Sequence, residues 1–234
     1  MRTPKRTLAI ETATEACSVA VFEGDQLLAG QHFVLGRGHA ERLVPMIQAL
    51  PDNGKAARIL VSLGPGSFTG VRIGIAAARA LGLAWDADVQ GYPTLTLLAA
   101  MAQSERPDAP LMVCMNGGHG EWFVQNYSHG SNPESEVQSL TPDEAVAVCN
   151  YQVIAGNRAQ EMADQLGGQS VALNILPDAR KTYLLREAQL TTNLAPIYGR
   201  GPDAKLPTAM GRSMEQAPSR RCASSSQYFC HSQY

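Results

Sequence analysis

The sequence predicts an α/β fold, and three observations carry that prediction. Runs with the apolar period of strands alternate with runs of helical period over roughly the first hundred residues. A glycine-rich turn at 64–70 joins a strand to a long helix, and a polar segment containing prolines at 104–110 ends the alternation. We therefore expect a first α/β lobe over 1–103, a second, smaller lobe over 104–207 and a poorly ordered tail over 208–234.

The composition is that of a globular protein with little net charge. The chain has 234 residues, 44% of them hydrophobic, and a formal net charge of -2. This balance excludes a wholly disordered chain and leaves no overall basic field to attract nucleic acid. No apolar run approaches the ~20 residues of a membrane span, and the apolar stretch after the basic start is broken at Glu11 and Glu15. We expect neither a membrane segment nor a secretory signal.

The cysteines indicate a reducing compartment. Their number is five, which is odd, and no two of them have CxxC spacing. Such a set favours free thiols over a disulfide framework or a zinc site. We therefore expect a cytoplasmic protein.

The first elements of the first lobe are three strands and a helix. Apolar and alternating runs predict strands at 7–10, 18–22 and 26–34, with a polar turn between the first two. Apolar residues at helical spacing then predict an amphipathic helix from 39 to 50, which ends at a run of turn residues.

Two further strands and two helices complete the first lobe. The β-branched run at 58–63 predicts a buried strand, and the segment 71–84, rich in Ala, Leu and Ile without proline, predicts a helix. A short strand at 89–92 and a helix at 94–103 follow. The order of these elements is typical of an α/β lobe.

The second lobe has a less regular pattern. An apolar run at 111–115 and an alternating run at 121–127 predict a hairpin. Thr141, followed by proline and two carboxylates, predicts a capped helix start. A strand and turn over 153–157 and a helix over 157–166, which ends at two glycines, complete the pattern.

The glycine-rich turn has two interpretations. Glycines let a ligand approach the backbone, and the helix that follows offers free N–H groups to a phosphate. The turn lacks the Lys of a P-loop and the spacing of GxGxxG, so a tight structural connection between strand and helix is the other interpretation. With the polar turn after the first strand, the candidate nucleotide-binding residues are Thr12, Thr14, Gly64, Gly66 and Ser67.

Two predicted helices each present one uniform face. Apolar residues recur at helical spacing on the first, and small residues recur every four positions on the second. Such a smooth face lets another backbone approach closely, and that backbone belongs either to this chain's own sheet or to a partner's helix. The two faces consist of Leu43, Met46, Ile47 and Leu50, and of Gly70, Gly74, Ala78 and Gly82.

The sequence offers no clear metal or nucleophile pattern. Its histidines include no HxxH or HxxxH pair, so we expect no metal site. Ser67 does not stand in a GxSxG turn, and a peptidase would need a nucleophile with a base in hydrogen-bond reach. We therefore assign no catalytic residue.

Four segments resemble the TsaB (YeaZ) family. They are Leu8–Ala20 (LAIETATEACSVA), His39–Ile47 (HAERLVPMI), Gly64–Gly74 (GPGSFTGVRIG) and Pro196–Lys205 (PIYGRGPDAK). The third is the most specific of them. Where the family has Asp in its first turn, this chain has Glu11.

The resemblance implies a fold, a function and partners. The fold would be the actin-like, Hsp70-like ATPase (ASKHA) fold, with two lobes of related topology. The chain would be a non-catalytic subunit that binds and activates TsaD, which places threonylcarbamoyl on the tRNA adenosine next to the anticodon. A TsaE-like ATPase would join the complex, ATP and metal would belong to these partners, and tRNA would be contacted indirectly.

The same resemblance assigns the two uniform helix faces to the partner interface. Without TsaD, we expect a homodimer through that surface, because large exposed apolar patches associate. Two alternatives stay open: an independent nucleotide-binding enzyme such as an actin-like ATPase or kinase, and a glycoprotease-like peptidase.

Overall fold

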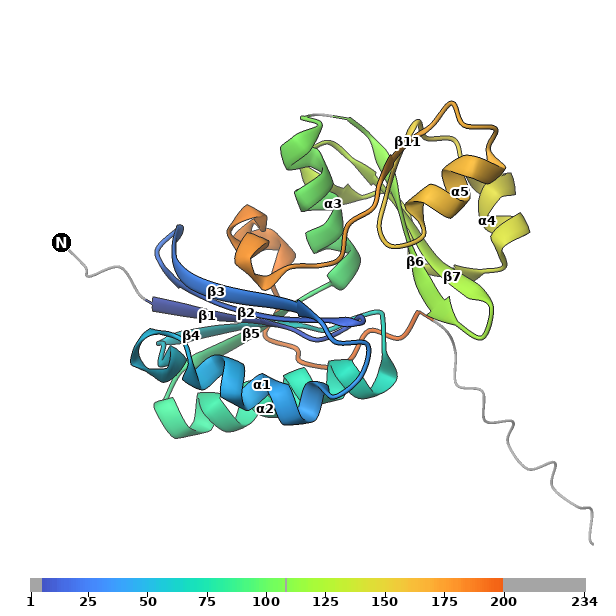
Figure 1. The fold of residues 1–234 in the computed structure, drawn as a ribbon. Helices are drawn as coiled ribbons and strands as arrows, with labels where there is room; N and C mark the ends of the chain where they lie inside the picture. The colour runs from blue at the N-terminus through green and yellow to red at the C-terminus, as the bar shows by residue number, and fades with distance from the viewer. Residues whose placement is uncertain (1–5, 108, 200–234) are drawn as a thin grey trace, which may run out of the picture. The chain divides into compact units, whose positions relative to one another are not determined.

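The first half of the chain builds a five-stranded sheet (Figure 1). The computed structural model describes residues 6–107 and 109–199. The strand order is β3-β2-β1-β4-β5, in which β1, β2 and β3 are antiparallel and β4 and β5 run parallel to β1. The strands are β1 (Arg6–Glu11), β2 (Ala16–Glu23), β3 (Gln26–Val34), β4 (Arg58–Ser62) and β5 (Asp88–Tyr92).

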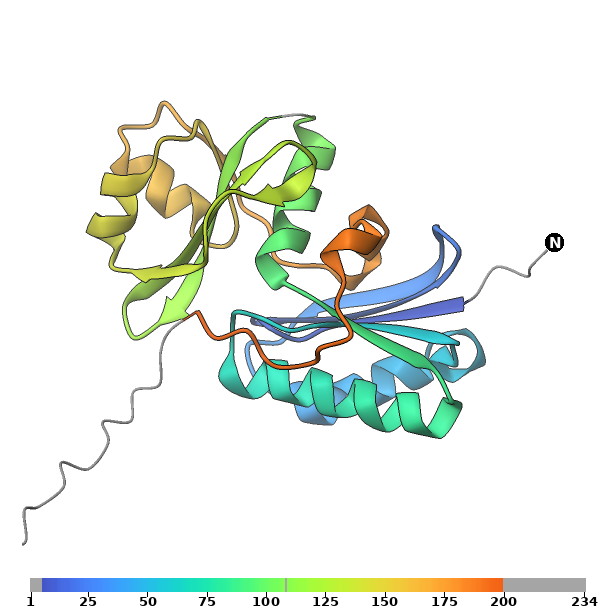
Figure 2. The same cartoon turned by 180° about the vertical axis from the view of Figure 1, so that it is seen from behind.

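Helices cover both faces of this sheet. α1 (His39–Gln48) and α2 (Phe68–Trp85) lie side by side on one face, where their buried side chains join those of β1, β2 and β4 in one apolar cluster (Figures 1 and 2). On the other face lie α3 (Thr94–Glu105) and the 3₁₀ helix η3 (Ala179–Leu184), with a second cluster that includes the fully buried Tyr92. The central strands are therefore buried on both sides, which is why their sequences are almost continuously apolar.

The second half builds a smaller sheet with its own helices. Its strand order is β11-β10-β6-β7-β8, and β9 also pairs with β7. α3 packs on one face, and α4 (Pro142–Val148) and α5 (Ala159–Gln165) pack on the other. The strands are β6 (Leu111–Gly118), β7 (Glu121–Ser128), β8 (Asn132–Pro133), β9 (Gln138–Leu140), β10 (Val153–Ala155) and β11 (Val171–Leu173). The remaining 3₁₀ turns are η1 (Pro51–Gly54), η2 (His129–Ser131) and η4 (Glu187–Gln189).

The two sheets share one topology. In each, antiparallel strands, of which the first two pair with each other, are followed by a helix, a parallel strand on the other side of the first strand, a second helix and a second parallel strand. β6, β7, β10 and β11 thus repeat β1, β2, β4 and β5. The predicted α/β class and the pair of lobes with related topology are confirmed. The predicted boundaries at 103/104 and 207/208 stay predictions, and 208–234 lie outside the described residues.

After β11 the chain returns to the first sheet. The backbone N–H of Ala179 donates to Ser18 Oγ on β2 at 2.9 Å. Thr191 then forms a bridge with Gly91 on β5, and the N–H of Ile197 donates to the carbonyl of Leu63 at 2.8 Å. The segment 174–198 therefore ends beside the start of α2, which the sequence did not predict.

Most predicted elements occupy their expected places. The capping box at Thr141 is present, since the side chains of Thr141 and Glu144 exchange hydrogen bonds with each other's backbone. Cys17, Cys114 and Cys149 are free thiols, and burial raises the pKa of Cys17 to about 11. No helix of the described residues combines the length and apolar character needed to cross a bilayer.

Candidate functional site

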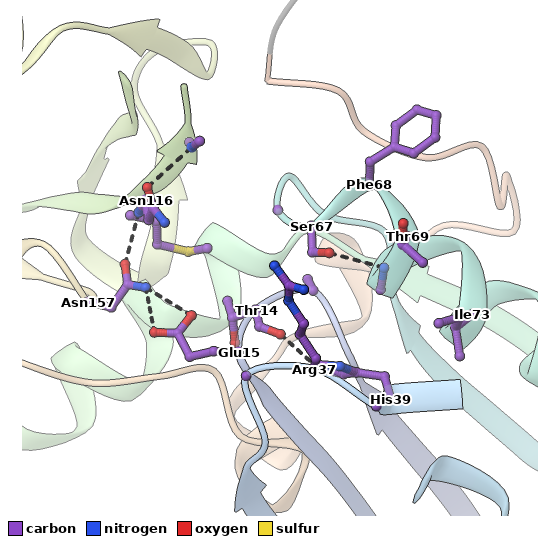
Figure 3. Close-up of a pocket in the computed structure, with 18 of the residues that line it drawn as sticks. Thr14, Glu15, Arg37, His39, Ser67, Phe68, Thr69, Ile73, Asn116 and Asn157 are labelled. Carbon is purple, nitrogen blue, oxygen red and sulfur yellow. Dashed lines mark hydrogen bonds between the residues drawn. The ribbon is translucent and has the colours of Figure 1, made fainter. Parts of the chain in front are cut away.

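A candidate site is a cavity of about 730 Å³ that is lined by residues from both halves of the chain (Figure 3). Four parts of the chain line it: the β1–β2 turn, the start of α1, the glycine-rich turn with the start of α2, and the β6–β7 hairpin with Asn157. In residue numbers these are 13–15, 36–41, 66–70 with 73, and 115–119 with 157. A cavity of this size fits a small organic ligand.

Asn157 joins the two halves at one wall of the cavity. Its Nδ2 donates to both oxygens of Glu15 at 3.0 and 3.2 Å, and its Oδ1 accepts from the backbone N–H of Asn116 at 2.9 Å (Figure 3). Asn116 Oδ1 in turn accepts from Gly118 N. The β1–β2 turn is thereby held against the second sheet by a charge-assisted contact.

The glycine-rich turn is a tight structural connection. The N–H of Ser67 donates to the carbonyl of Ala13 at 2.6 Å, and Ser67 Oγ caps α2 by accepting from Gly70 N. A Cβ on Gly66 would lie 2.1 Å from the Ala13 carbonyl oxygen. Glycine is therefore required here because the turn presses against the backbone of the β1–β2 turn.

The structure gathers only part of the candidate nucleotide-binding set. Thr14, Gly66 and Ser67 line the cavity, whereas Thr12 and Gly64 do not. Thr12 is fully buried, and its Oγ1 donates to the carbonyl of Gly70 at 2.8 Å. Thr14 Oγ1 accepts from a backbone N–H. Thr14, Gly66 and Ser67 therefore line a space that has room for a ligand. The hydroxyls of Thr14 and Ser67, however, already accept hydrogen bonds from nearby backbone N–H groups.

Glu11 is buried beneath the cavity lining. Its Oε1 accepts from Ala13 N at 2.7 Å, and the hydroxyl of Tyr92 donates to Oε2 at 3.3 Å. Burial raises the pKa of Glu11 to about 7, although hydrogen bonds from Ala13, Ser62 and Tyr92 act in the opposite direction. Its carboxyl group serves the packing of the sheet and does not line the cavity.

The predicted partner faces point inward, which corrects that part of the sequence interpretation. On α1, Leu43, Met46 and Ile47 are buried against the first sheet, as is Leu50, which follows the helix. The small residues Gly70, Gly74, Ala78 and Gly82 are also buried.

The small residues of α2 admit the chain's own sheet. A Cβ on Gly74 would lie 2.4 Å from Thr12 Oγ1, and one on Gly82 would lie 2.4 Å from Val89 Cγ2. Of the two neighbours considered from the sequence, the chain's own sheet and a partner's helix, it is therefore the chain's own sheet that packs against these small residues.

The opposite, outward faces of these helices carry exposed apolar side chains. Val44 of α1 is 51% exposed, and Phe68 and Leu83 of α2 are 63% and 88% exposed. Tyr198, brought back by the return segment, is 55% exposed beside Phe68. This surface could not be predicted from the sequence, because the helical period does not tell which of two apolar faces points outward.

The described residues, 6–107 and 109–199, contain no group of three or more His, Cys, Asp or Glu side chains that could hold a metal ion.

Comparisons with known proteins find a TsaD family model and relatives named TsaB. A family model described as "TsaD: tRNA N6-adenosine threonylcarbamoyltransferase" matches residues 34–187, more than half of the chain. A relative from Escherichia coli K12, named "tRNA threonylcarbamoyladenosine biosynthesis protein TsaB", is 38% identical over 133 residues, which is 54% of this chain and 57% of that protein. A Haemophilus influenzae protein of the same name is 41% identical over 103 residues, 42% of each chain. The matches thus span less than two thirds of these relatives.

A solved structure shares the fold over more of the chain. "YeaZ from Pseudomonas aeruginosa" superposes with a TM-score of 0.69 at 26% identity, covering 82% of this chain and 99% of that one. A second structure from that organism, described as similar to peptidase YeaZ, gives a TM-score of 0.68 at 25% identity, with coverage of 83% and 99%.

Proposed function

This chain belongs to the TsaB (YeaZ) family, and on that premise we propose that it acts in threonylcarbamoylation of tRNA as a non-catalytic subunit. In this role it binds a TsaD-type subunit and holds it in its active geometry. The threonylcarbamoyl transfer takes place on that partner, and ATP and metal are bound by the partner subunits. A TsaE-type ATPase completes the assembly, and tRNA is contacted through the partners.

The observation that carries the proposal is the outward face of α1 and α2. We define this face by Val44, Phe68, Arg72, Ala76 and Leu83. Three of these are large apolar side chains between 51% and 88% exposed on two adjacent helices. Large apolar side chains gathered on one pair of helices support a protein–protein interface, with Ala76 allowing a partner helix to approach.

In the absence of the partner, the same face is proposed to pair two copies of this chain. In a two-fold dimer the same surface of each copy faces the other copy. The outward face of α1 and α2 can therefore bind either a second copy of this chain or the TsaD-type subunit. The homodimer and the complex with TsaD are then mutually exclusive. Light scattering of the isolated chain should report a dimer that gives way to a heteromeric complex when TsaD is added.

Reconstitution tests the proposal. TsaD- and TsaE-type subunits from the same organism are incubated with tRNA, an activated threonylcarbamoyl donor and ATP, with and without this chain. Modified tRNA should form only when the chain is present. Equal modification without it, or threonylcarbamoyl transfer by the chain alone, would overturn the proposal.

A further inference from the structure

An exposed cluster of two aromatic rings and one arginine lies at the start of α2. The guanidinium of Arg72 sits over the ring of Phe68, with Cζ 3.2 Å from the ring centroid. One of its nitrogens donates to the hydroxyl of Tyr198 at 2.6 Å, and the rings of Phe68 and Tyr198 lie 6.2 Å apart. We call these three residues the arginine cluster. Phe68 also lines the edge of the cavity, and in Figure 3 its ring points away from Ser67 and Thr14.

The arginine cluster is held in place before any partner binds. Stacking on Phe68 and the hydrogen bond to Tyr198 fix the long side chain of Arg72, so less side-chain entropy is lost when it makes further contacts. All three residues are nevertheless exposed. A rigid but solvent-facing arginine between aromatic rings has the composition of an interface hot spot.

The charge of Arg72 lacks an acidic partner within the described residues. No carboxylate of 6–107 or 109–199 pairs with it, and α2 contains no acidic residue. A guanidinium has five N–H donors, and a carboxylate can accept two of them side by side. The Tyr198 hydroxyl, which accepts from Arg72, keeps its own proton free to donate to the same carboxylate.

We propose that the arginine cluster receives an acidic side chain of the TsaD-type partner and anchors the interface formed by the outward face. This inference rests on the proposed function and adds the chemistry of the contact. The partner contributes an Asp or Glu that meets the guanidinium edge, while apolar atoms beside it cover the free faces of Phe68 and Tyr198. Burial of this ion pair makes the interface specific. A partner without the carboxylate would leave the charge of Arg72 buried and unpaired.

A protein partner fits the cluster better than RNA does. α2 carries only two arginines, Arg72 and Arg79, and Arg79 donates to the carbonyl of Leu194. The chain as a whole has a net charge of -2. Affinity for a nucleic acid depends on several phosphate contacts, which this surface does not offer. The other residues of the outward face, Val44, Ala76 and Leu83, are instead apolar.

The test measures the dissociation constant of the full-length chain for its TsaD-type subunit. Arg72→Gln should weaken binding by about tenfold or more, and Arg72→Lys should recover only part of it, since an ammonium group lacks the planar fork. Tyr198→Phe keeps the ring but removes the hydroxyl, and should weaken binding by about threefold. Arg106→Gln, at an exposed arginine outside the cluster and the outward face, is the matched control and should bind like the wild type.

Three outcomes would overturn the inference. The first is binding of Arg72→Gln within about twofold of the wild type. The second is an Arg72→Gln protein that binds TsaD normally but loses affinity for an isolated tRNA anticodon stem-loop, which would assign the cluster to RNA. The third is a wild-type chain that does not bind TsaD at all, which removes the proposed function itself. Thermal unfolding of each variant checks that it is folded. If Arg72→Gln does not fold, the dissociation constant of Tyr198→Phe provides the test instead.

Discussion

The two faces of α2 differ in what fixes their residues. The inward face is made of Gly70, Gly74, Ala78 and Gly82, each pressed against the chain's own backbone or side chains. The outward face carries Phe68, Arg72 and Leu83 in contact with solvent. Substitutions on the first should therefore change folding, whereas substitutions on the second should change association. The inward face of α2 thus serves the fold, and its outward face serves the proposed binding of a partner.

The largest effect is expected at the centre of the inward face. Gly74→Leu places a side chain where even a Cβ lies 2.4 Å from Thr12 Oγ1, an atom held by its bond to Gly70. We expect a loss of about 3 kcal/mol or more in the free energy of unfolding, measured by urea denaturation. Ala76→Leu, on the outward face of the same helix, is the control and should change stability by less than about 0.5 kcal/mol. Equal losses in both variants would contradict the distinction between the faces.

The second prediction concerns Glu11, which precedes the residue that Gly74 contacts. Its pKa is raised from 4.5 to about 7, so the native state holds the proton more tightly than the unfolded chain. The resulting stability is full below pH 4.5 and is lost as the pH rises to about 7 and beyond. Glu11→Gln removes this dependence, because the amide does not ionise.

The two proteins should therefore diverge with pH. Relative to the wild type, Glu11→Gln should gain up to about 3 kcal/mol between pH 4.5 and pH 8. Urea denaturation at several pH values measures the difference. A constant difference across that range would show that Glu11 does not titrate abnormally and that the interior under α2 is more hydrated than its burial indicates.

A smaller effect is expected at the far end of the inward face. Gly82→Ala gains about 1 kcal/mol of helix propensity but places a Cβ 2.4 Å from Val89 Cγ2. Val89 is β-branched and stiff, so the contact should outweigh the propensity and leave a net loss of about 1 kcal/mol. Thermal unfolding measures it. A variant more stable than the wild type would mean that Val89 on β5 can move to make room for the new Cβ. Close packing would then require glycine only at Gly70 and Gly74.

The smallest effect on stability is expected on the outward face. Leu83→Ser exchanges a side chain that is 88% exposed, so the free energy of unfolding should change by less than about 0.5 kcal/mol. Affinity for the TsaD-type subunit should nevertheless fall by about threefold, because the apolar contact in the complex is lost. Unchanged affinity, measured by calorimetry, would place the interface away from this end of α2.

Much of the fold could be predicted from the sequence because local patterns encode it. The strands and helices of the first sheet have clear periods, and the capping box at Thr141 marks a helix start by its own chemistry. The short strands β8 and β9 were not predicted, since their few and mostly polar residues form no apolar run, and neither was β11. The arginine cluster was also missed, because Arg72 and Tyr198 are 126 positions apart.

The sequence by itself determined which residues of α2 share a face and that its glycines need a close neighbour. It could not determine which face meets the sheet, because small and apolar residues occur on both and a period of 3.6 is the same from either side. Only the tertiary structure decided this, by packing Thr12 and Val89 into the small-residue face and returning Tyr198 to the other. The physical reason is that protein interiors are close-packed, so the space beside each glycine is filled by the nearest part of the molecule, and here that is the chain's own first sheet.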